Sequence, residues 1–239
     1  MTPGRGLVIV GTDTGVGKTY VGCALLRALR SRGLRAAPYK PVETGCPRRA
    51  GRWFPRDASA LLRASGAGAF RRKVPGGAEG DPAGLDLREV CPFPYRTPVA
   101  PALAARLERR PLSLGEMVAG HRRLARRFDF LLVETAGGLL SPLAPRATNR
   151  DLVRALGLPA MVVAANRLGA LNHTLLTLEA LERARVPVGA VVLNHPRLLR
   201  GPAERGNGRE LRRLLGGTPV VEFSRRGTGE GLARLLLRR

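Results

Sequence analysis

The sequence predicts an α/β fold in which residues 1–239 form a single domain around a doubly wound, mostly parallel sheet. Short apolar runs alternate with segments of helical period, and this alternation favours successive βαβ units. A glycine-rich loop separates the first apolar run from the first helical segment. The chain has 239 residues, 44% hydrophobic content and no internal repeat, which suits one globular domain with a substantial core.

Five apolar runs are predicted as strands of this sheet. Each is short and bounded by polar or glycine-containing segments, as expected for strands that are covered on both faces. They are residues 7–11, 35–40, 128–134, 160–165 and 189–194. Because the carboxyl ends of parallel strands meet at one edge of a sheet, we expect the residues that end these runs to lie close together.

Helical patterns lie between the runs. They cover residues 18–32, 57–64 and 98–108, a segment that opens at Ser113, and a segment that Asn172 caps and that runs to residue 183. Gly33 suits the position after a helix C-terminus, and Glu116 lies three residues after Ser113, as in a capping box. Residues 66–89 are rich in Gly, Ala and Pro and have no clean period, so we expect a surface loop there.

The net charge of +23 comes almost entirely from arginine. Only three of the 41 basic residues are lysine, and the arginines are scattered over helices and loops. Aromatic residues make up 4% of the chain, too few for a base-stacking platform. We therefore expect no nucleic-acid partner. No apolar run approaches the ~20 residues of a membrane span, and residues 7–10 are too short for a signal-peptide core, so we expect a cytoplasmic protein without a membrane partner.

The three cysteines are odd in number and far apart, without a CxxC pair, so we expect reduced thiols rather than a zinc site or disulfides. Cys46 follows a candidate site loop, which makes its thiol a candidate for reactivity.

The strongest motif is GTDTGVGKT at residues 11–19, between a predicted strand and a predicted helix. Backbone N–H groups of such a loop and of the helix N-terminus surround phosphate oxygens, which predicts a P-loop NTPase fold. Lys18 would reach the terminal phosphates, and the Thr19 hydroxyl would bind magnesium. Thr12 occupies the usual place of the first glycine, which here comes one residue earlier at Gly11. The predicted nucleotide-binding residues of the loop are Asp13, Thr14, Gly15, Val16, Gly17, Lys18 and Thr19.

A second motif, YKPVETG, ends the second predicted strand. Its position places Lys40 in the same crevice as the phosphate loop, and Pro41 restricts the turn that follows. Lysine is rare in this chain, and two of the three lysines lie in these two motifs. This favours a functional ammonium group over a solvated surface charge.

Polar residues also end two later strands. Glu134 follows four apolar residues and precedes a glycine-rich turn, as in a Walker B arrangement, and magnesium prefers such carboxylate ligands. Asp57, at the start of a short helix, could be a second ligand or only a helix-terminal charge. Asn194 could read an adenine edge or simply form a turn.

Together these motifs resemble the dethiobiotin synthetase family. The segments that carry the resemblance are GTDTGVGKT, KPVETG, ETAGGLLSPL, NRLGALNHTLLT and VVLNHP, spread in order over residues 6–196. The family binds 7,8-diaminononanoate, carbon dioxide and ATP with Mg²⁺. One amine is held as a carbamate, its oxygen attacks the γ-phosphate, and the second amine closes the cyclic urea and expels phosphate.

The resemblance implies a role for each candidate residue. The residues expected to act on carbamate and phosphoryl groups are Lys40, Lys18 and Thr14. The residues expected to hold magnesium are Thr19, Asp57 and Glu134. The residues expected near diaminononanoate are Thr44, Pro41 and Asn172, the last in a stretch through which family members form homodimers. Asn194 is expected to read adenine, although the divergent segment 222–225 leaves the choice among ATP, CTP and GTP open.

Three alternatives remain open from the sequence. A partitioning or septum-site ATPase would carry a second lysine where this chain has Asp13. A cobyrinic-acid-type amide-forming synthetase would need an appended glutaminase domain, which we do not expect in a chain of this length. A basic nucleic-acid-binding protein with an incidental phosphate loop would bind DNA in a salt-sensitive way without substrate-dependent turnover.

Overall fold

The computed structural model describes residues 6–67, 84–195, 201–224 and 226–237. Six strands form its central sheet, all paired in parallel in the order β12-β11-β10-β1-β7-β2. The strands are β1 (Gly6–Gly11), β2 (Ala36–Tyr39), β7 (Phe130–Gly138), β10 (Ala160–Ala165), β11 (Val188–His195) and β12 (Val220–Ser224). The predicted parallel α/β sheet is confirmed, with β12 as a strand that the sequence analysis did not predict.

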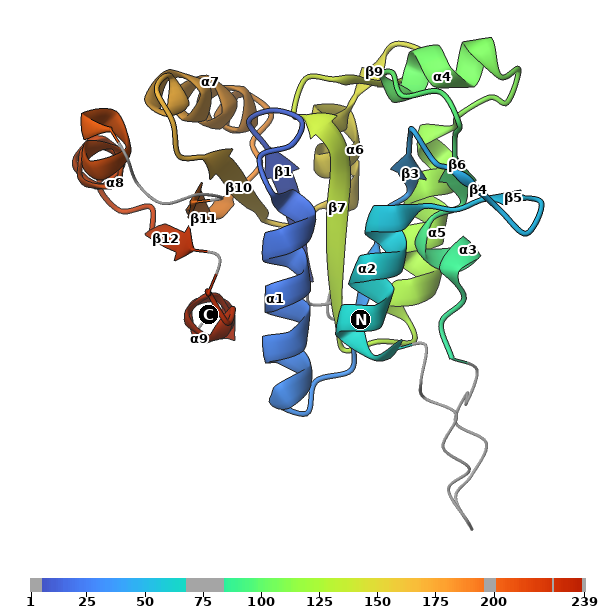
Figure 1. The fold of residues 1–239 in the computed structure, drawn as a ribbon, viewed down its shortest axis with the longest axis horizontal. Helices are drawn as coiled ribbons and strands as arrows, with labels where there is room; N and C mark the ends of the chain where they lie inside the picture. Colours follow the sequence, from blue (N-terminus) through green and yellow to red (C-terminus); the bar gives the residue numbers. More distant parts are fainter. Residues whose placement is uncertain (1–5, 68–83, 196–200, 225, 238–239) are drawn as a thin grey trace.

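Alternating residues of each strand face two separate apolar layers. In β1, Leu7 and Ile9 join one buried cluster, whereas Val8 and Val10 join the other. The first layer lies under α1 (Lys18–Ser31), α2 (Arg56–Ser65) and α9 (Glu230–Leu237) (Figure 1). The second lies under α5 (Leu114–Ala125), α6 (Asn149–Leu156), α7 (Ala170–Arg183) and α8 (Pro202–Leu215). Helices on both faces explain why the strand runs are almost continuously apolar.

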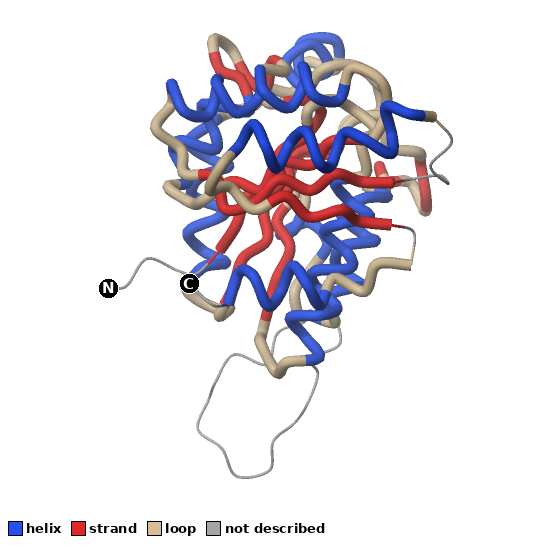
Figure 2. The backbone as a smooth tube through the Cα atoms, turned by 90° about the vertical axis from the view of Figure 1, so that its left-hand side faces the viewer, coloured by secondary structure: helices blue, strands red, loops and turns tan. Residues whose placement is uncertain are grey.

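Short elements cover the carboxyl edge of the sheet on the β2 and β7 side. There β3 (Val42–Glu43) pairs with β6 (Phe93–Pro94), and α4 (Pro101–Leu107) packs on β8 (Pro142–Ala144). The remaining short elements are α3 (Leu87–Val90), β4 (Arg48–Arg49), β5 (Arg52–Trp53) and β9 (Ala147–Thr148). Figure 2 shows the strands of the sheet between helices on either side. No helix in the described ranges has the length and apolar character needed to cross a bilayer.

Several predicted boundaries need correction. Asn172 does not cap α7, because the helix begins at Ala170 after Gly169, whose φ of 87° is left-handed. Asn172 lies instead in the first helical turn. The strand that contains Glu134 continues to Gly138, so the carboxylate lies within β7 rather than at its end.

The predicted surface loop over 66–89 is wrong at its C-terminal end. Asp86 caps the short helix α3 by accepting from the N–H of Arg88, and Ala67 and Leu85 are buried. Residues 68–83 lie outside the described ranges. Ser113 does cap α5, with its hydroxyl 3.3 Å from the N–H of Glu116.

Candidate active site

The phosphate-loop motif forms the connection between β1 and α1. Gly15 and Gly17 have left-handed φ values of 73° and 99°, which suit glycine and turn the backbone into the helix. The N-terminus of α1 has no side-chain cap and no acidic residue in its first turn. Its first N–H groups are therefore free of side-chain capping and lie where a phosphate would be stabilised by the helix dipole.

Lys18 is buried at the start of α1, and among the described residues it bonds to two backbone carbonyls. Its Nζ lies 2.8 Å from the oxygen of Gly137 and 3.1 Å from that of Asp13. Burial lowers the pKa of Lys18 to about 8, although the Glu134 carboxylate opposes the shift. The side chain is thus an incompletely compensated cation beside the glycine-rich loop, which suits it to an anionic phosphate.

Lys40 and Glu134 form a buried ion pair next to this loop. The Lys40 Nζ lies 2.5 Å from Glu134 Oε1 and 3.4 Å from Asp57 Oδ2. Burial alone would lower the pKa of Lys40, but the carboxylates of Glu134 and Asp57 outweigh it and raise that pKa above the ordinary value. Lys40 therefore stays charged. The predicted convergence of Lys18, Lys40 and Glu134 agrees with the geometry.

The same cluster offers oxygen ligands for a cation. Thr19 donates its hydroxyl to Glu134 Oε1 over 2.8 Å, and Asp57 is half-exposed at the start of α2. Glu134 Oε2 is buried and has no hydrogen-bond partner within the described residues. An unpartnered buried carboxylate oxygen beside a hydroxyl and a second carboxylate fits Mg²⁺, which takes hard oxygen ligands.

Two positioning residues were missed by sequence reasoning. Glu43 is buried, and its two carboxylate oxygens accept from the N–H groups of Asp57 and Ala58, each over 3.0 Å. It therefore caps α2 from a distant segment, where no local capping pattern could reveal it. Asn149 donates to the carbonyls of Ala136 and Gly138 over 2.7 and 2.8 Å, and so holds the turn that contacts Lys18.

A cavity of about 420 Å³ opens beside the loop. Thr14 and Thr44 line it together with Ala136, Gly137, Ser141 and the 98–101 segment. Two predicted substrate residues do not line it. Pro41 is buried, and its carbonyl accepts from the N–H of Phe93 between β3 and β6, whereas Asn172 is exposed on α7.

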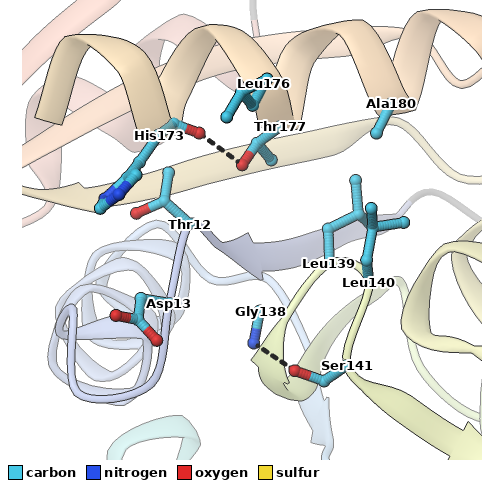
Figure 3. Close-up of a pocket in the computed structure, with 10 residues that line it drawn as sticks. All are labelled: Thr12, Asp13, Gly138, Leu139, Leu140, Ser141, His173, Leu176, Thr177 and Ala180. Carbon is cyan, nitrogen blue, oxygen red and sulfur yellow. Dashed lines mark hydrogen bonds between the residues drawn. The ribbon is translucent and has the colours of Figure 1, made fainter. Parts of the chain in front are cut away.

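A second cavity, of about 390 Å³, lies between the phosphate loop, the turn after β7 and the side of α7 (Figure 3). Thr12 and Asp13 line one side, and His173, Leu176 and Thr177 line the other. Ser141 lines both cavities and accepts from the N–H of Gly138 over 3.0 Å. The two cavities therefore meet at this turn.

Asn194 is buried at the end of β11, behind the phosphate loop. Its Nδ2 donates to the carbonyl of Val16 over 2.9 Å, and its Oδ1 has no partner among the described residues. A Cβ on Gly17 would collide with this amide, so glycine is required for the close approach. Asp13 bonds to its neighbour's N–H and pairs with Arg167 at 3.4 Å.

Comparison with known proteins gives a matching family model and several relatives that share one name. A family model described as an AAA domain matches residues 5–63 and 84–221. The ATP-dependent dethiobiotin synthetase of Anaeromyxobacter dehalogenans strain 2CP-C is 45% identical over 91% of this chain and 88% of its own length. That of Anaeromyxobacter sp. strain Fw109-5 is 43% identical, covering 92% and 90%, and that of Thermodesulfovibrio yellowstonii is 35% identical, covering 88% and 84%.

A solved structure shares the fold. The cell division protein FtsY of Thermotoga maritima superposes with a TM-score of 0.51, at 18% identity, over 98% of this chain and 69% of that chain. At this identity the likeness concerns the fold alone, and it agrees with the predicted α/β fold.

Proposed function

The chain belongs to the ATP-dependent dethiobiotin synthetase family and is an ATP-dependent cyclo-ligase, and from this premise we propose how its residues act in closing the ring of dethiobiotin. The observation that carries the proposal is that Thr14 and Lys18, which follow β1, and Lys40, which follows β2, come together. Thr14 lines the cavity, Lys18 bonds to the cavity-lining Gly137, and Lys40 pairs with Glu134 of β7. The substrates are 7,8-diaminononanoate, carbon dioxide and ATP, and the products are dethiobiotin, ADP and phosphate.

The cavity beside the loop would hold the two amines of diaminononanoate. One amine adds to carbon dioxide and loses a proton to give a carbamate, next to the hydroxyls of Thr14 and Thr44. The carbamate oxygen attacks the γ-phosphorus of ATP and displaces ADP. The second amine then attacks the carbamoyl carbon and expels phosphate, which closes the urea ring.

The protein's part is positioning and charge stabilisation, which carry most of the catalysis in phosphoryl transfer. Lys18 would contact the β- and γ-phosphates, and Lys40 would stabilise charge that develops between carbamate and phosphoryl oxygens. Mg²⁺ would be held by Thr19, Asp57 and Glu134 and would neutralise phosphate charge when bound. The unpartnered Glu134 oxygen supports this ligand set.

Asn194 would recognise the base. Its free Oδ1 is an acceptor, which fits the exocyclic amine of adenine, and the backbone around Asp13 to Thr19 would surround the phosphates. Pro41 would act only by fixing the turn after Lys40, because it does not line the cavity.

We also propose a homodimer that completes the substrate site. Leu140 and Leu176, which line the cavity beside α7, are 55% and 57% exposed, and Leu168, which precedes α7 in the chain, is 86% exposed. Exposed apolar side chains that lie together are typical of a protein–protein contact. Pairing through α7 would bring Asn172 of one subunit towards the diaminononanoate tail in the other, which is consistent with its being exposed and lining neither cavity of its own chain.

We propose a cytoplasmic enzyme that acts on small molecules, without a nucleic-acid or membrane partner. The scattered distribution of the arginines argues against a nucleic-acid groove. Several of them are already paired with carboxylates at the surface, for example Arg35 with Asp129 and Arg212 with Glu222.

A direct assay tests the proposed function. The protein is incubated with diaminononanoate, bicarbonate and MgATP, and dethiobiotin is measured by mass alongside ADP. We expect one ADP for each dethiobiotin formed. ATP hydrolysis without dethiobiotin would overturn the assignment.

A further inference from the structure

A chain of hydrogen bonds that the mechanism does not use links the ends of β10 and β11 and the middle of β12 to α8. Asn207 Nδ2 lies 2.8 Å from Asn166 Oδ1, and Asn166 Nδ2 lies 3.0 Å from His195 Nδ1. His195 Nε2 then lies 3.2 Å from Glu222 Oε2. Asn166, His195 and Asn207 are all buried. A fully bonded buried network of this kind favours one local arrangement.

Two backbone carbonyls determine the donor and the acceptor of each hydrogen bond in this network. Asn207 Nδ2 also faces the carbonyl of Arg167 at 3.1 Å, and Asn166 Nδ2 faces that of Glu204 at 2.7 Å, so both atoms must be amide NH₂ groups. His195 Nδ1 can then only accept. Its Nε2 carries the hydrogen and donates to Glu222, which defines a single tautomer.

The network leads directly to the residue proposed to read the base. The backbone N–H of Asn166 donates to the main-chain carbonyl of Asn194 over 2.8 Å, and His195 follows Asn194 in the sequence. Asn194 is thus restrained on one side by this network and on the other by its bond to Val16. What remains for a ligand is its buried Oδ1.

Helix α8 has a glycine where the Glu222 side chain packs against it. A Cβ on Gly208 would collide with the Glu222 carboxylate, so the glycine in the helix provides the space. Arg212, one turn further along α8, holds the other carboxylate oxygen at 2.7 Å.

We propose that Asn166, Asn207, His195 and Glu222 are positioning residues that set base selectivity by orienting the Asn194 carboxamide. The inference rests on the proposed nucleotide-binding role of this site. An oriented acceptor favours a base with an exocyclic amine, such as adenine, over hypoxanthine, which carries a carbonyl at that position. Removing the Glu222 acceptor frees the His195 ring and the strand end, so the carboxamide loses its fixed direction.

The test compares the affinities of MgADP and MgIDP by calorimetry, without diaminononanoate, so that it does not depend on dethiobiotin formation. We expect the wild-type protein to prefer ADP, and Glu222→Ala to reduce the ADP/IDP affinity ratio by roughly tenfold, the value of one hydrogen bond. IDP affinity itself should stay nearly unchanged, because the phosphate loop is intact.

Two further variants separate positioning from a general loss of structure. Glu222→Gln keeps an acceptor for His195 and should largely restore the ratio. Glu210→Ala, which removes an exposed carboxylate of α8 paired with Arg213, should leave it at the wild-type value. Gly208→Ala should lower the ratio although alanine ordinarily stabilises a helix interior relative to glycine.

The inference is overturned if the wild type does not distinguish ADP from IDP, or if Glu222→Ala weakens both nucleotides equally. It is also overturned if Glu222→Ala leaves the ratio unchanged. Dethiobiotin formation with ATP, measured separately, shows whether the proposed function holds in each case.

Discussion

Lys18 and Lys40 lie beside the same loop but are held in different ways. Lys18 bonds to two backbone carbonyls, so its removal leaves no unpaired charge behind. Lys40 neutralises the buried carboxylate of Glu134. Breaking such a pair by removing one partner costs about 3–5 kcal/mol, because the remaining charge stays buried.

We therefore predict different outcomes for two alanine variants. Lys18→Ala should reduce kcat/KM by about 10²–10³, a typical loss for one charge-stabilising contact, with a melting temperature close to the wild type. Lys40→Ala should lose at least as much activity and should also unfold at a clearly lower temperature. Steady-state kinetics and thermal unfolding measure both effects. Near-normal turnover in either variant would contradict the proposed roles.

A second feature at the scale of single residues is the protonation of the three cysteine thiols. Burial raises the pKa of Cys23 to about 11 and that of Cys46 to about 12, and it raises the pKa of Cys91 well above its usual value. All three thiols are free and buried. The pKa values lie above pH 8, so the thiols are protonated there, and the candidate reactivity of Cys46 is not supported.

We predict that the native protein reacts only slowly with a disulfide reagent at pH 8, because the thiolate is the reacting form. In denaturant, all three cysteines should react at once. Between pH 7 and 9 the rate of the native reaction should rise about tenfold per pH unit without reaching a plateau, because both pH values lie well below the thiol pKa values. A single rapidly labelled thiol in the native protein would show that burial does not protect that site.

At the scale of elements, helix α2 delivers Asp57 to the charged cluster. Glu43 of β3 caps this helix by accepting from the N–H groups of Asp57 and Ala58, its second and third residues. Asp57 itself is half-exposed and makes one long ion pair, with Lys40 at 3.4 Å. Its contribution to folding stability is therefore small, whereas its carboxylate is free to reach a metal ion.

We predict that Asp57→Asn raises the Mg²⁺ concentration for half-maximal activity by roughly 10- to 100-fold, comparable to other losses of a metal-site partner. The Mg²⁺-dependent thermal stabilisation of the ADP complex should shrink in parallel. Asp129→Asn, which breaks the exposed pair with Arg35, is the matched control and should change neither value. An unchanged Mg²⁺ response in Asp57→Asn would remove Asp57 from the metal site.

The elements that the sequence could predict are those with a strong local signal. Strands β1 and β10 are uninterrupted apolar runs, and the loop before α1 carries its own glycine pattern. Strand β12 was missed because it is short, half-exposed and contains Glu222. Helix α8 was missed because glycines interrupt its helical pattern, and Gly208 is there to admit a side chain from β12.

The residues of the candidate site also fall into two groups, those with a local sequence signal and those without one. Lys18, Lys40 and Glu134 could be predicted because each follows or lies within a recognisable strand. Glu43 and Asn149 could not, because each acts on backbone groups of another segment, and no spacing in the sequence records that contact. The sequence predicts a helix cap at Asn172 because asparagine favours that position, but the helix already begins at Ala170, after Gly169.

At the scale of the whole molecule, the apolar surface around α7 is not buried within a single chain. Leu140, Leu168 and Leu176 are exposed there, and Leu175 is 38% exposed. Leu175 and Leu176 of α7 therefore do not pack fully against the sheet of their own chain. A C₂ interface through α7 would bury each of them twice, once in either subunit.

We predict that Leu176→Glu raises the dimer dissociation constant by roughly 100-fold or more. Burying a leucine is worth about 1.5–3 kcal/mol, and the symmetry doubles the loss. The substrate KM should rise with it, because Asn172 of the second subunit would be withdrawn from the diaminononanoate tail.

Leu107→Glu is the matched control: Leu107 is 59% exposed at the end of α4, and its replacement should change neither association nor KM. Sedimentation velocity over micromolar concentrations, with kinetics on the same samples, measures both quantities. A wild-type chain that sediments as a monomer while turning over substrate normally would rule out the shared site. A Leu176→Glu chain that stays dimeric would place the interface elsewhere.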